Sequence, residues 1–279
     1  MKRISLALLF VASSFTASFA QDLKLPALSP GAKISQDFST SSIEINYSRP
    51  SMRGRKIFGE VVGYNDVWRT GANSATRVKF GEDVMIGNSE VKAGEYALYT
   101  IPGKDQWEVI LNKGTTNWGQ MGYHKSDDVA RLMVKPEKLD NNVQTFTINI
   151  SNITFNTCNI DLMWEKTKVT IPVKANNQER LDAAIDKAIN KPNIPYFQAA
   201  NYYFETGQDL NKAMEYVNKA LAQSPNAYYM YALKARIAQK QGDKQEAIAA
   251  ATQSMELAKG SAFENEYKRN MTKIIKAMK

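Results

Sequence analysis

The sequence predicts a two-domain protein: an all-β N-terminal domain of residues 21–174, built as a β-sandwich or barrel, and an all-α C-terminal domain of helical hairpins, residues 175–279. Two observations lead to this prediction. From Ser35 to Val173, apolar and polar residues alternate as they do in half-buried strands. After about Ala175 the apolar residues recur with a period of about 3.6, which is typical of one face of a helix. The change of period marks the boundary between the domains.

The N-terminal domain is expected to consist of short strands joined by tight turns. Alternating patterns occupy residues 43–47, 143–150 and 160–164. Gly87-Asn88 and Pro102-Gly103 lie between apolar runs, where such pairs favour hairpin turns. Closely spaced strands without intervening helices predict a sandwich or a barrel.

Within the helical region, the apolar pattern of residues 213–221 recurs 34 residues later, at 247–255. The spacing and the mixture of small and large residues resemble tetratricopeptide repeats, each of which is a helical hairpin. Because about three repeats are normally needed for stability, we expect either that a helix at residues 178–190 and the last helix complete the stack or that the β domain supports it. The predicted elements are repeats at about residues 194–227 and 228–261 and a capping helix at 262–278. Such stacks usually dock a protein partner in their concave face.

Residues 1–20 have the pattern of a secretory signal peptide. Lys2 and Arg3 precede an apolar run, and small residues follow as far as Ala20. The run is too short for a stable membrane anchor, and no later segment has about 18 apolar residues. We therefore expect a bacterial envelope protein that is cleaved after Ala20 and is periplasmic or secreted, with no stable membrane insertion.

The net charge indicates which classes of partner to expect, and the cysteine content indicates how the lone thiol is used. The formal net charge of +8 falls to +6 once Lys2 and Arg3 are removed, which favours anionic ligands. No dense basic stripe with interleaved aromatic residues is present, so we expect no nucleic-acid partner. Cys158 is the sole cysteine, and its strand-like surroundings predict a buried structural side chain.

One segment interrupts the alternation and concentrates arginine. Nine arginines follow the signal peptide, and five of them lie within residues 49–77, against two acids, Glu60 and Asp66. Arginine presents a planar fork that pairs with carboxylates and phosphates. The glycines of this segment permit tight turns beside a ligand, and Tyr47 and Trp68 offer flat faces to a sugar or an aromatic group.

The segment therefore predicts a loop site for an anionic small molecule, glycan or peptide. A second loop rich in glycine and aromatic residues, 117–124, suits the rim of such a site. The candidate ligand-binding residues are Tyr47, Arg49, Arg53, Arg55, Trp68, Arg69, Asn73, Thr76 and Trp118. The alternative is structural: the arginines would hold long loops to the sheet through backbone carbonyls and the two acids.

Three motifs in the N-terminal domain resemble an uncharacterised bacterial family, "domain of unknown function 2911". They are YSRPSMRGRKIFG, DVWRTGANSAT and AGEYALYTIPG, which begin at Tyr47, Asp66 and Ala93. The resemblance covers about residues 29–174 and implies that these form one domain. It implies no activity and no ligand, and the helical region lies outside it.

The sequence contains few residues or motifs that could support catalysis. His124 is the only histidine, so a histidine-based metal site has no partners and no metal is predicted. No phosphate-binding or dinucleotide-binding glycine motif is present, so no cofactor is predicted. The weak catalytic candidate is His124, oriented by Asp127 or Asp128 in a hydrolase-like arrangement. Acids beside a histidine more often decorate a solvated loop.

Three functions remain open at this point. The first is a non-catalytic envelope protein whose β domain binds an anionic ligand and whose repeats dock a protein partner. The second is a hydrolase that uses His124 with a carboxylate. The third is a purely structural assembly module. The lack of a coherent catalytic set favours the first.

Overall fold

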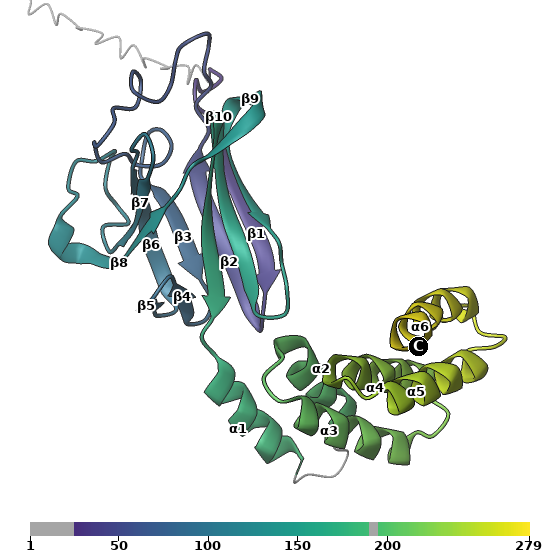
Figure 1. The fold of residues 1–279 in the computed structure, drawn as a ribbon. Coiled ribbons are helices and arrows are strands. Elements are labelled where there is room, and N and C mark those ends of the chain that lie inside the picture. Colours follow the sequence, from purple (N-terminus) through teal and green to yellow (C-terminus); the bar gives the residue numbers. More distant parts are fainter. Residues whose placement is uncertain (1–24, 190–194) are drawn as a thin grey trace, which may run out of the picture.

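The structure, a computed structural model, describes residues 25–189 and 195–279, in which a β domain precedes a helical domain (Figure 1). The signal peptide expected at residues 1–20 lies outside the described residues. The strands are β1 Gly31–Phe38, β2 Ser41–Ser48, β3 Thr76–Phe80, β4 Val84–Ile86, β5 Ser89–Val91, β6 Gly94–Ile101, β7 Trp107–Asn112, β8 Asp128–Val134, β9 Glu137–Ser151 and β10 Thr157–Ala175. The helices are α1 Gln178–Ala188, α2 Tyr196–Thr206, α3 Leu210–Gln223, α4 Tyr228–Gln241, α5 Lys244–Leu257 and α6 Glu264–Met278, with a short 3-10 helix at Lys125–Asp127.

The β domain is a sandwich of two open antiparallel sheets. One sheet has the order β1-β2-β3-β6-β7-β8 and the other β5-β4-β10-β9. The barrel alternative is therefore wrong, because neither sheet closes on itself. The hairpin turns at Gly87-Asn88 and Pro102-Gly103 are confirmed, since they join β4 to β5 and β6 to β7.

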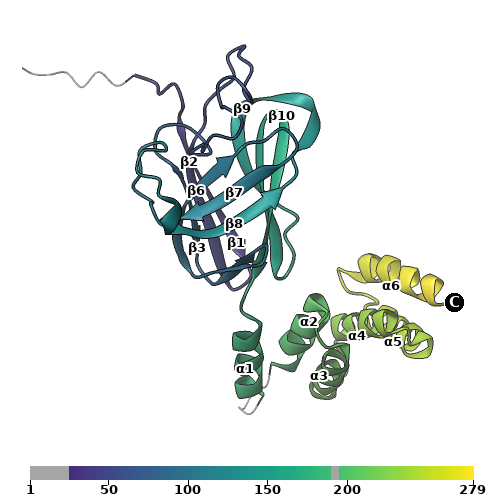
Figure 2. The same cartoon turned by 60° about the vertical axis from the view of Figure 1, so that its left-hand side comes forward.

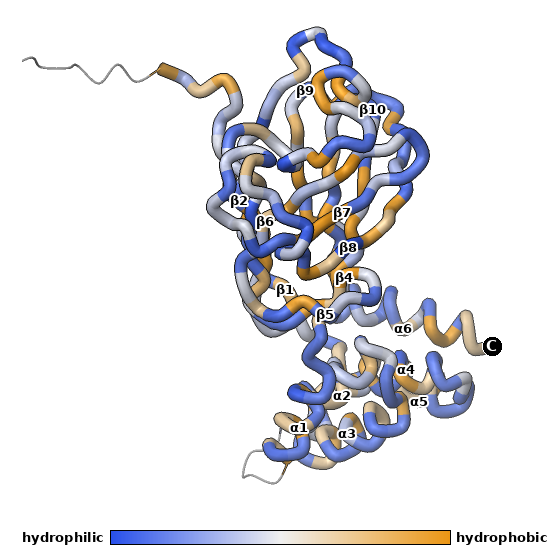
Figure 3. The backbone as a smooth tube through the Cα atoms, turned by 90° about the vertical axis from the view of Figure 1, so that its left-hand side faces the viewer, coloured by the Kyte–Doolittle hydropathy of each residue, from blue (hydrophilic) through white to orange (hydrophobic). Residues whose placement is uncertain are grey.

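The sandwich core lies between the two sheets. Ile45 and Leu98 of the first sheet and Ile160 and Leu162 of the second are at most 2% exposed and belong to one cluster. Figure 3 shows hydrophobic stretches concentrated along the strands of this domain. Period-two alternation thus places one apolar face of each sheet in the core.

An aromatic cluster occupies the core beside the long loop between β2 and β3. Seven ring pairs among Phe58, Trp68, Trp107, Phe146 and Trp164 have centroids between 4.9 and 6.3 Å apart. Trp68 and Trp164 are stacked, with their planes 19° apart. The loop is thus anchored to both sheets by its aromatic residues.

The single cysteine is buried, as expected. Cys158 on β10 is 1% exposed, and burial raises the pKa of its thiol to about 11. The neutral thiol therefore predominates near pH 7, which makes this side chain a small hydrophobic core residue.

The helices form two hairpins, α2 with α3 and α4 with α5, and α6 packs against the second (Figure 2). Gly207 lies at the turn between α2 and α3, and Gly242 lies at the turn between α4 and α5. Both glycines are in the left-handed conformation that ends α2 and α4. The Asp243 carboxylate then caps α5 by accepting from the backbone N–H of Glu246.

Alanines allow the helices of the hairpins to approach closely. The buried alanines include Ala213, Ala220, Ala235, Ala238, Ala247 and Ala251. None of the helices within the described ranges is both long and apolar enough to cross a membrane.

A polar junction links α1 to the end of the sandwich. The Asn177 amide donates to Ser39 Oγ at 2.9 Å and to Glu82 Oε2 at 2.6 Å. Arg180 donates to Thr40 Oγ1 at 2.7 Å and to Glu82 Oε2 at 3.0 Å. Glu82 is therefore the common acceptor that holds the first helix to the β domain.

Candidate functional site

A strained turn supports Arg69. Seven non-glycine residues in the described chain have positive φ, and four of them (Arg53, Asn65, Thr70 and Asn73) lie in the loop between β2 and β3. Thr70 is the least expected, because it is β-branched, has a φ of 52° and is fully buried. Such strain persists only where the surroundings enforce it, often at functional sites.

Buried hydrogen bonds enforce this turn. The hydroxyls of Thr70 and Thr100 lie 3.1 Å apart, and Thr76 Oγ1 donates to the Thr70 carbonyl at 2.6 Å. The Trp68 indole donates to the Gly71 carbonyl at 3.0 Å. Thr76, a predicted ligand contact, is fully buried and supports the turn instead.

Three of the candidate arginines hold loops in place. Their guanidinium groups donate mainly to backbone carbonyls: Arg49 to Phe146 O and to Thr147 Oγ1, Arg53 to Leu28 O, and Arg55 to Met52 O and Ser51 O. The structural alternative therefore describes these three side chains well.

Tyr47, Trp68 and Asn73 are also occupied by internal contacts. Tyr47 is 7% exposed, and its hydroxyl accepts from the Ile148 backbone N–H at 3.1 Å. Trp68 is 8% exposed. The expectation that these two rings present broad free faces is therefore corrected: both belong to the core. The Asn73 amide bonds to Ser48 Oγ at 3.2 Å.

Arg69 differs from the other arginines of the loop. Within the described residues its guanidinium makes no hydrogen bond and no ion pair, and its Nε is buried without a partner. The side chain lines a cavity of about 400 Å³ together with Arg55, Asp66, Trp68, Gln120 and Trp164. The structure thus brings three of the nine candidate residues, Arg55, Trp68 and Arg69, to one cavity.

The second glycine-rich loop forms one side of this site. A backbone bridge joins Ser74 to Trp118, and a Cβ added at Gly119 would lie 2.6 Å from Arg69 Nη1. The Arg69 guanidinium therefore lies against the Gly119 backbone. Trp118 is 59% exposed and lies outside the cavity lining.

Asp66, Gln120 and Trp164 were not among the predicted ligand contacts. Asp66 and Gln120 lie in the two loops that the sequence singled out, so their residue types could have been noted. Trp164 is on β10, and only the folding of that strand over the loop brings it to the cavity.

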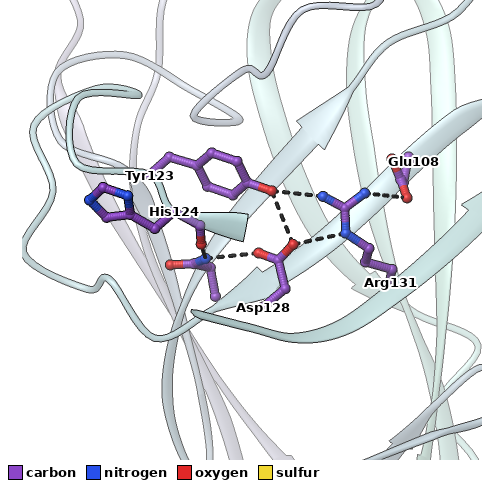
Figure 4. A network of polar contacts seen from close by, with 6 residues as sticks. Glu108, Tyr123, His124, Asp128 and Arg131 are labelled. Atoms are coloured by element: carbon purple, nitrogen blue, oxygen red, sulfur yellow. Dashed lines mark hydrogen bonds and ion pairs between the residues drawn. The ribbon is translucent and has the colours of Figure 1, made fainter. Parts of the chain in front are cut away.

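His124 does not form the catalytic pair considered from the sequence. Its imidazole is exposed and points away from Asp128 in Figure 4. The His124 backbone carbonyl accepts from the Asn112 amide at 2.9 Å and from the Asp127 backbone N–H at 3.0 Å. No hydrogen bond joins the imidazole to Asp127 or Asp128 within the described residues. No group of His, Cys, Asp and Glu in the same residues is placed to hold a metal ion.

Asp128 instead belongs to a closed network. Asp128 accepts from Arg131 Nε at 2.8 Å and from the Tyr123 hydroxyl at 3.0 Å, while Arg131 Nη1 donates to Glu108 at 2.6 Å (Figure 4). Burial, together with Asp128, raises the pKa of Tyr123. These bonds fix the loop that follows β7 onto the outer face of the sheet.

The helical domain has a separate groove of about 660 Å³ between α2, α4 and α6. Its lining mixes apolar and aromatic residues with polar ones: Phe197, Asn201, Tyr229, Leu233, Arg236, Tyr267, Asn270, Met271 and Lys273 are among them. Arg236 is paired with Glu205 at 3.0 Å and lies over the Phe204 ring. Lys273 and Asn270 make no side-chain hydrogen bond or ion pair within the described residues.

The fold is that of a β-sandwich protein with an appended stack of helical hairpins. The chain matches the family model described as protein of unknown function (DUF2911) over residues 29–173, about half of its length, and it belongs to this family. The predicted resemblance is thereby confirmed.

A second model, the auxiliary subunit of N-terminal acetyltransferase A, matches residues 136–267. Residues 137–175 of that match form β9 and β10, so the similarity that bears on the repeats lies in the helices, a tetratricopeptide-like region. No curated protein and no solved structure matches the chain.

Proposed function

We propose that this is an exported envelope protein of the interaction class. Its helical repeats dock a segment of a protein partner, and its β domain recognises an anionic small molecule, glycan or peptide. The groove between α2, α4 and α6 is the observation that leads to this proposal.

The lining of the groove suits a polypeptide segment. Tyr229 is 41% exposed and offers an aromatic face that can anchor an apolar side chain. Asn270 and Lys273 have no side-chain partner in the described part of the chain, so they can bond to backbone carbonyls and acidic groups of a protein partner. A volume of about 660 Å³ lies within the range of sites that bind peptides or small molecules.

Export is supported by the signal-peptide pattern of residues 1–20. A chain whose lone cysteine is buried suits an oxidising compartment, because the thiol is protected from unwanted disulfides. We therefore assign the protein to the periplasm or the extracellular space.

Site-specific photo-crosslinking in cells tests the docking role. A crosslinking residue at Asn270 lies in the groove, whereas one at Lys259, an exposed position outside the groove lining, serves as the control. We expect a discrete protein adduct from Asn270 and none from Lys259. The partner segment identified by mass spectrometry should then bind the purified protein, and Lys273→Glu together with Tyr229→Ala should weaken that binding. Equal adducts at both positions, or none at either, would contradict docking in the groove.

A hydrolytic role for His124 receives no support from the geometry, because its imidazole is exposed and pairs with none of the described residues. A structural role fits Arg49, Arg53 and Arg55, which bond to backbone carbonyls. It does not account for Arg69, whose guanidinium has no partner in the described chain.

A further inference from the structure

The cavity beside Arg69 combines a free cation with hydrogen-bonding and aromatic groups. A guanidinium has five N–H donors, and Arg69 uses none of them within the described residues. A buried donor without a partner is unfavourable, and the Nε of Arg69 is such a donor, so a ligand group that accepts from it would remove an existing penalty.

The charge of the lining points to a monoanion. Arg55 and Arg69 contribute two positive charges and Asp66 contributes one negative charge. No ion pair joins Asp66 to either arginine, so the charge of Arg69 is not neutralised within the site. A net lining charge of +1 complements a carboxylate, whereas a phosphate monoester carries nearly two negative charges at pH 7. The planar fork of arginine also matches the geometry of a carboxylate.

The remaining lining groups suit a hydroxylated ligand. Asp66 is an acceptor for hydroxyl groups, and Gln120 both donates and accepts. Both side chains are exposed at the mouth of the cavity. Trp68 and Trp164 are 8% and 2% exposed, so they form a closed apolar floor of the cavity and offer no free ring face to a ligand. A volume of about 400 Å³ is sufficient for one monosaccharide.

We propose that the cavity lined by Arg69, Asp66 and Gln120, with Trp68 and Trp164 at its floor, binds the carboxylate form of a sugar acid. The Arg69 guanidinium donates hydrogen bonds to the carboxylate. Arg55 contributes only long-range electrostatic attraction, because its Nε and Nη2 remain bonded to the carbonyls of Met52 and Ser51. Because it specifies the ligand of the β domain, this site rests on the proposed function.

Isothermal titration of the purified protein with three matched sugars tests the site. Glucuronate, glucose and glucose 6-phosphate share one ring and differ in the group at its sixth carbon. We expect glucuronate to bind most tightly, and Arg69→Gln to weaken it by at least about tenfold, the loss typical of removing one charged partner. Arg69→Lys keeps the positive charge but loses the planar fork, so its affinity for glucuronate should lie between those of the wild type and Arg69→Gln.

The matched control is Arg269→Gln on α6. Arg269 is also without a partner in the described chain, but it is exposed and remote from the cavity lining. This variant removes the same charge and should bind glucuronate as the wild type does. Since the Arg69 guanidinium makes no hydrogen bond or ion pair with any described residue, Arg69→Gln should unfold at a temperature no lower than the wild type, which separates lost binding from misfolding.

The opposing outcomes are distinct. Glucuronate binding that is unchanged in Arg69→Gln would overturn the site. Tighter binding of glucose 6-phosphate that requires Arg69 would overturn the sugar-acid assignment yet leave anion recognition by the β domain standing. If neither anion binds, both the sugar-acid site and the anionic-ligand half of the proposed function fail, while docking in the helical groove is judged by crosslinking.

Discussion

At the scale of single residues, the position of the Arg69 guanidinium depends on the absence of a side chain at Gly119. Gly119 has a φ of +68°, and a Cβ placed there would lie 2.6 Å from Arg69 Nη1. The glycine thus serves two purposes, because it permits the left-handed turn and leaves room for the guanidinium. The position of Arg69 can therefore be tested without changing any charge.

Gly119→Ala is expected to displace the Arg69 guanidinium and to weaken glucuronate binding several-fold in a titration. The left-handed backbone at this position should also lower the free energy of unfolding by about 1 kcal/mol. Gly242→Ala is the control, since Gly242 has a φ of +80° but nothing within 4 Å of the added Cβ. It should be destabilised to a similar extent and bind normally. Wild-type affinity in Gly119→Ala would show that Arg69 is not held where the ligand binds.

At the scale of elements, the junction between β10 and α1 depends on one carboxylate. Glu82 lies in the turn between β3 and β4 and accepts bonds from Thr40, Asn177 and Arg180. Burial by itself would raise the pKa of Glu82, but the hydrogen bonds, led by that of Asn177, outweigh it and hold the pKa below its ordinary value. The junction is therefore stabilised only while Glu82 is ionised.

This shift gives stability a defined pH dependence. A carboxyl whose pKa is lowered by folding contributes fully above its unfolded pKa, about 4.3 for Glu, and loses that contribution as the pH falls through the folded value. Glu82→Gln should therefore lower the free energy of unfolding by roughly 1–2 kcal/mol at pH 7 and by much less at pH 3. Urea titrations at both pH values measure this difference. Glu60→Gln, at an exposed acid 3.9 Å from Lys56, is the control and should show little effect at either pH. A constant deficit from pH 7 to pH 3 would contradict the role of the ionised group.

The same elements show what the sequence could predict. The strands, the turns at Gly87-Asn88 and Pro102-Gly103 and the helical hairpins followed from local periodicity and turn chemistry, which act over a few residues. The roles of the arginines did not follow. Arg49 bonds to the carbonyl of Phe146, 97 residues away, and this pairing exists only once β9 lies beside the loop. Sequence therefore located the arginine-rich loop, but only tertiary packing distinguishes Arg69 from its neighbours.

At the scale of the whole molecule, the two domains have separate cores. The sandwich core contains no residue of the helices, and the helical clusters contain none of the strands. The contacts between the domains include the polar junction at Glu82 and the packing of Phe155 against Tyr202, with ring centroids 5.8 Å apart. All four tryptophans, at positions 68, 107, 118 and 164, lie in the β domain. Tryptophan fluorescence therefore reports on the sandwich, and helical circular dichroism on the repeats.

The substitution Ile237→Ala tests whether the two domains unfold independently. Ile237 on α4 is fully buried among the helices, so its truncation leaves a cavity that should cost the helical domain about 3 kcal/mol. We expect the loss of helical dichroism on heating to shift to lower temperature while the fluorescence transition stays in place, because the sandwich core is untouched. Ile45→Ala, at a fully buried position of β2, is the reciprocal variant and should shift the fluorescence transition. If Ile237→Ala moves both transitions together, the polar junction is strong enough to make the chain one cooperative unit, and a partner docked on the repeats could then stabilise the ligand-binding domain as well.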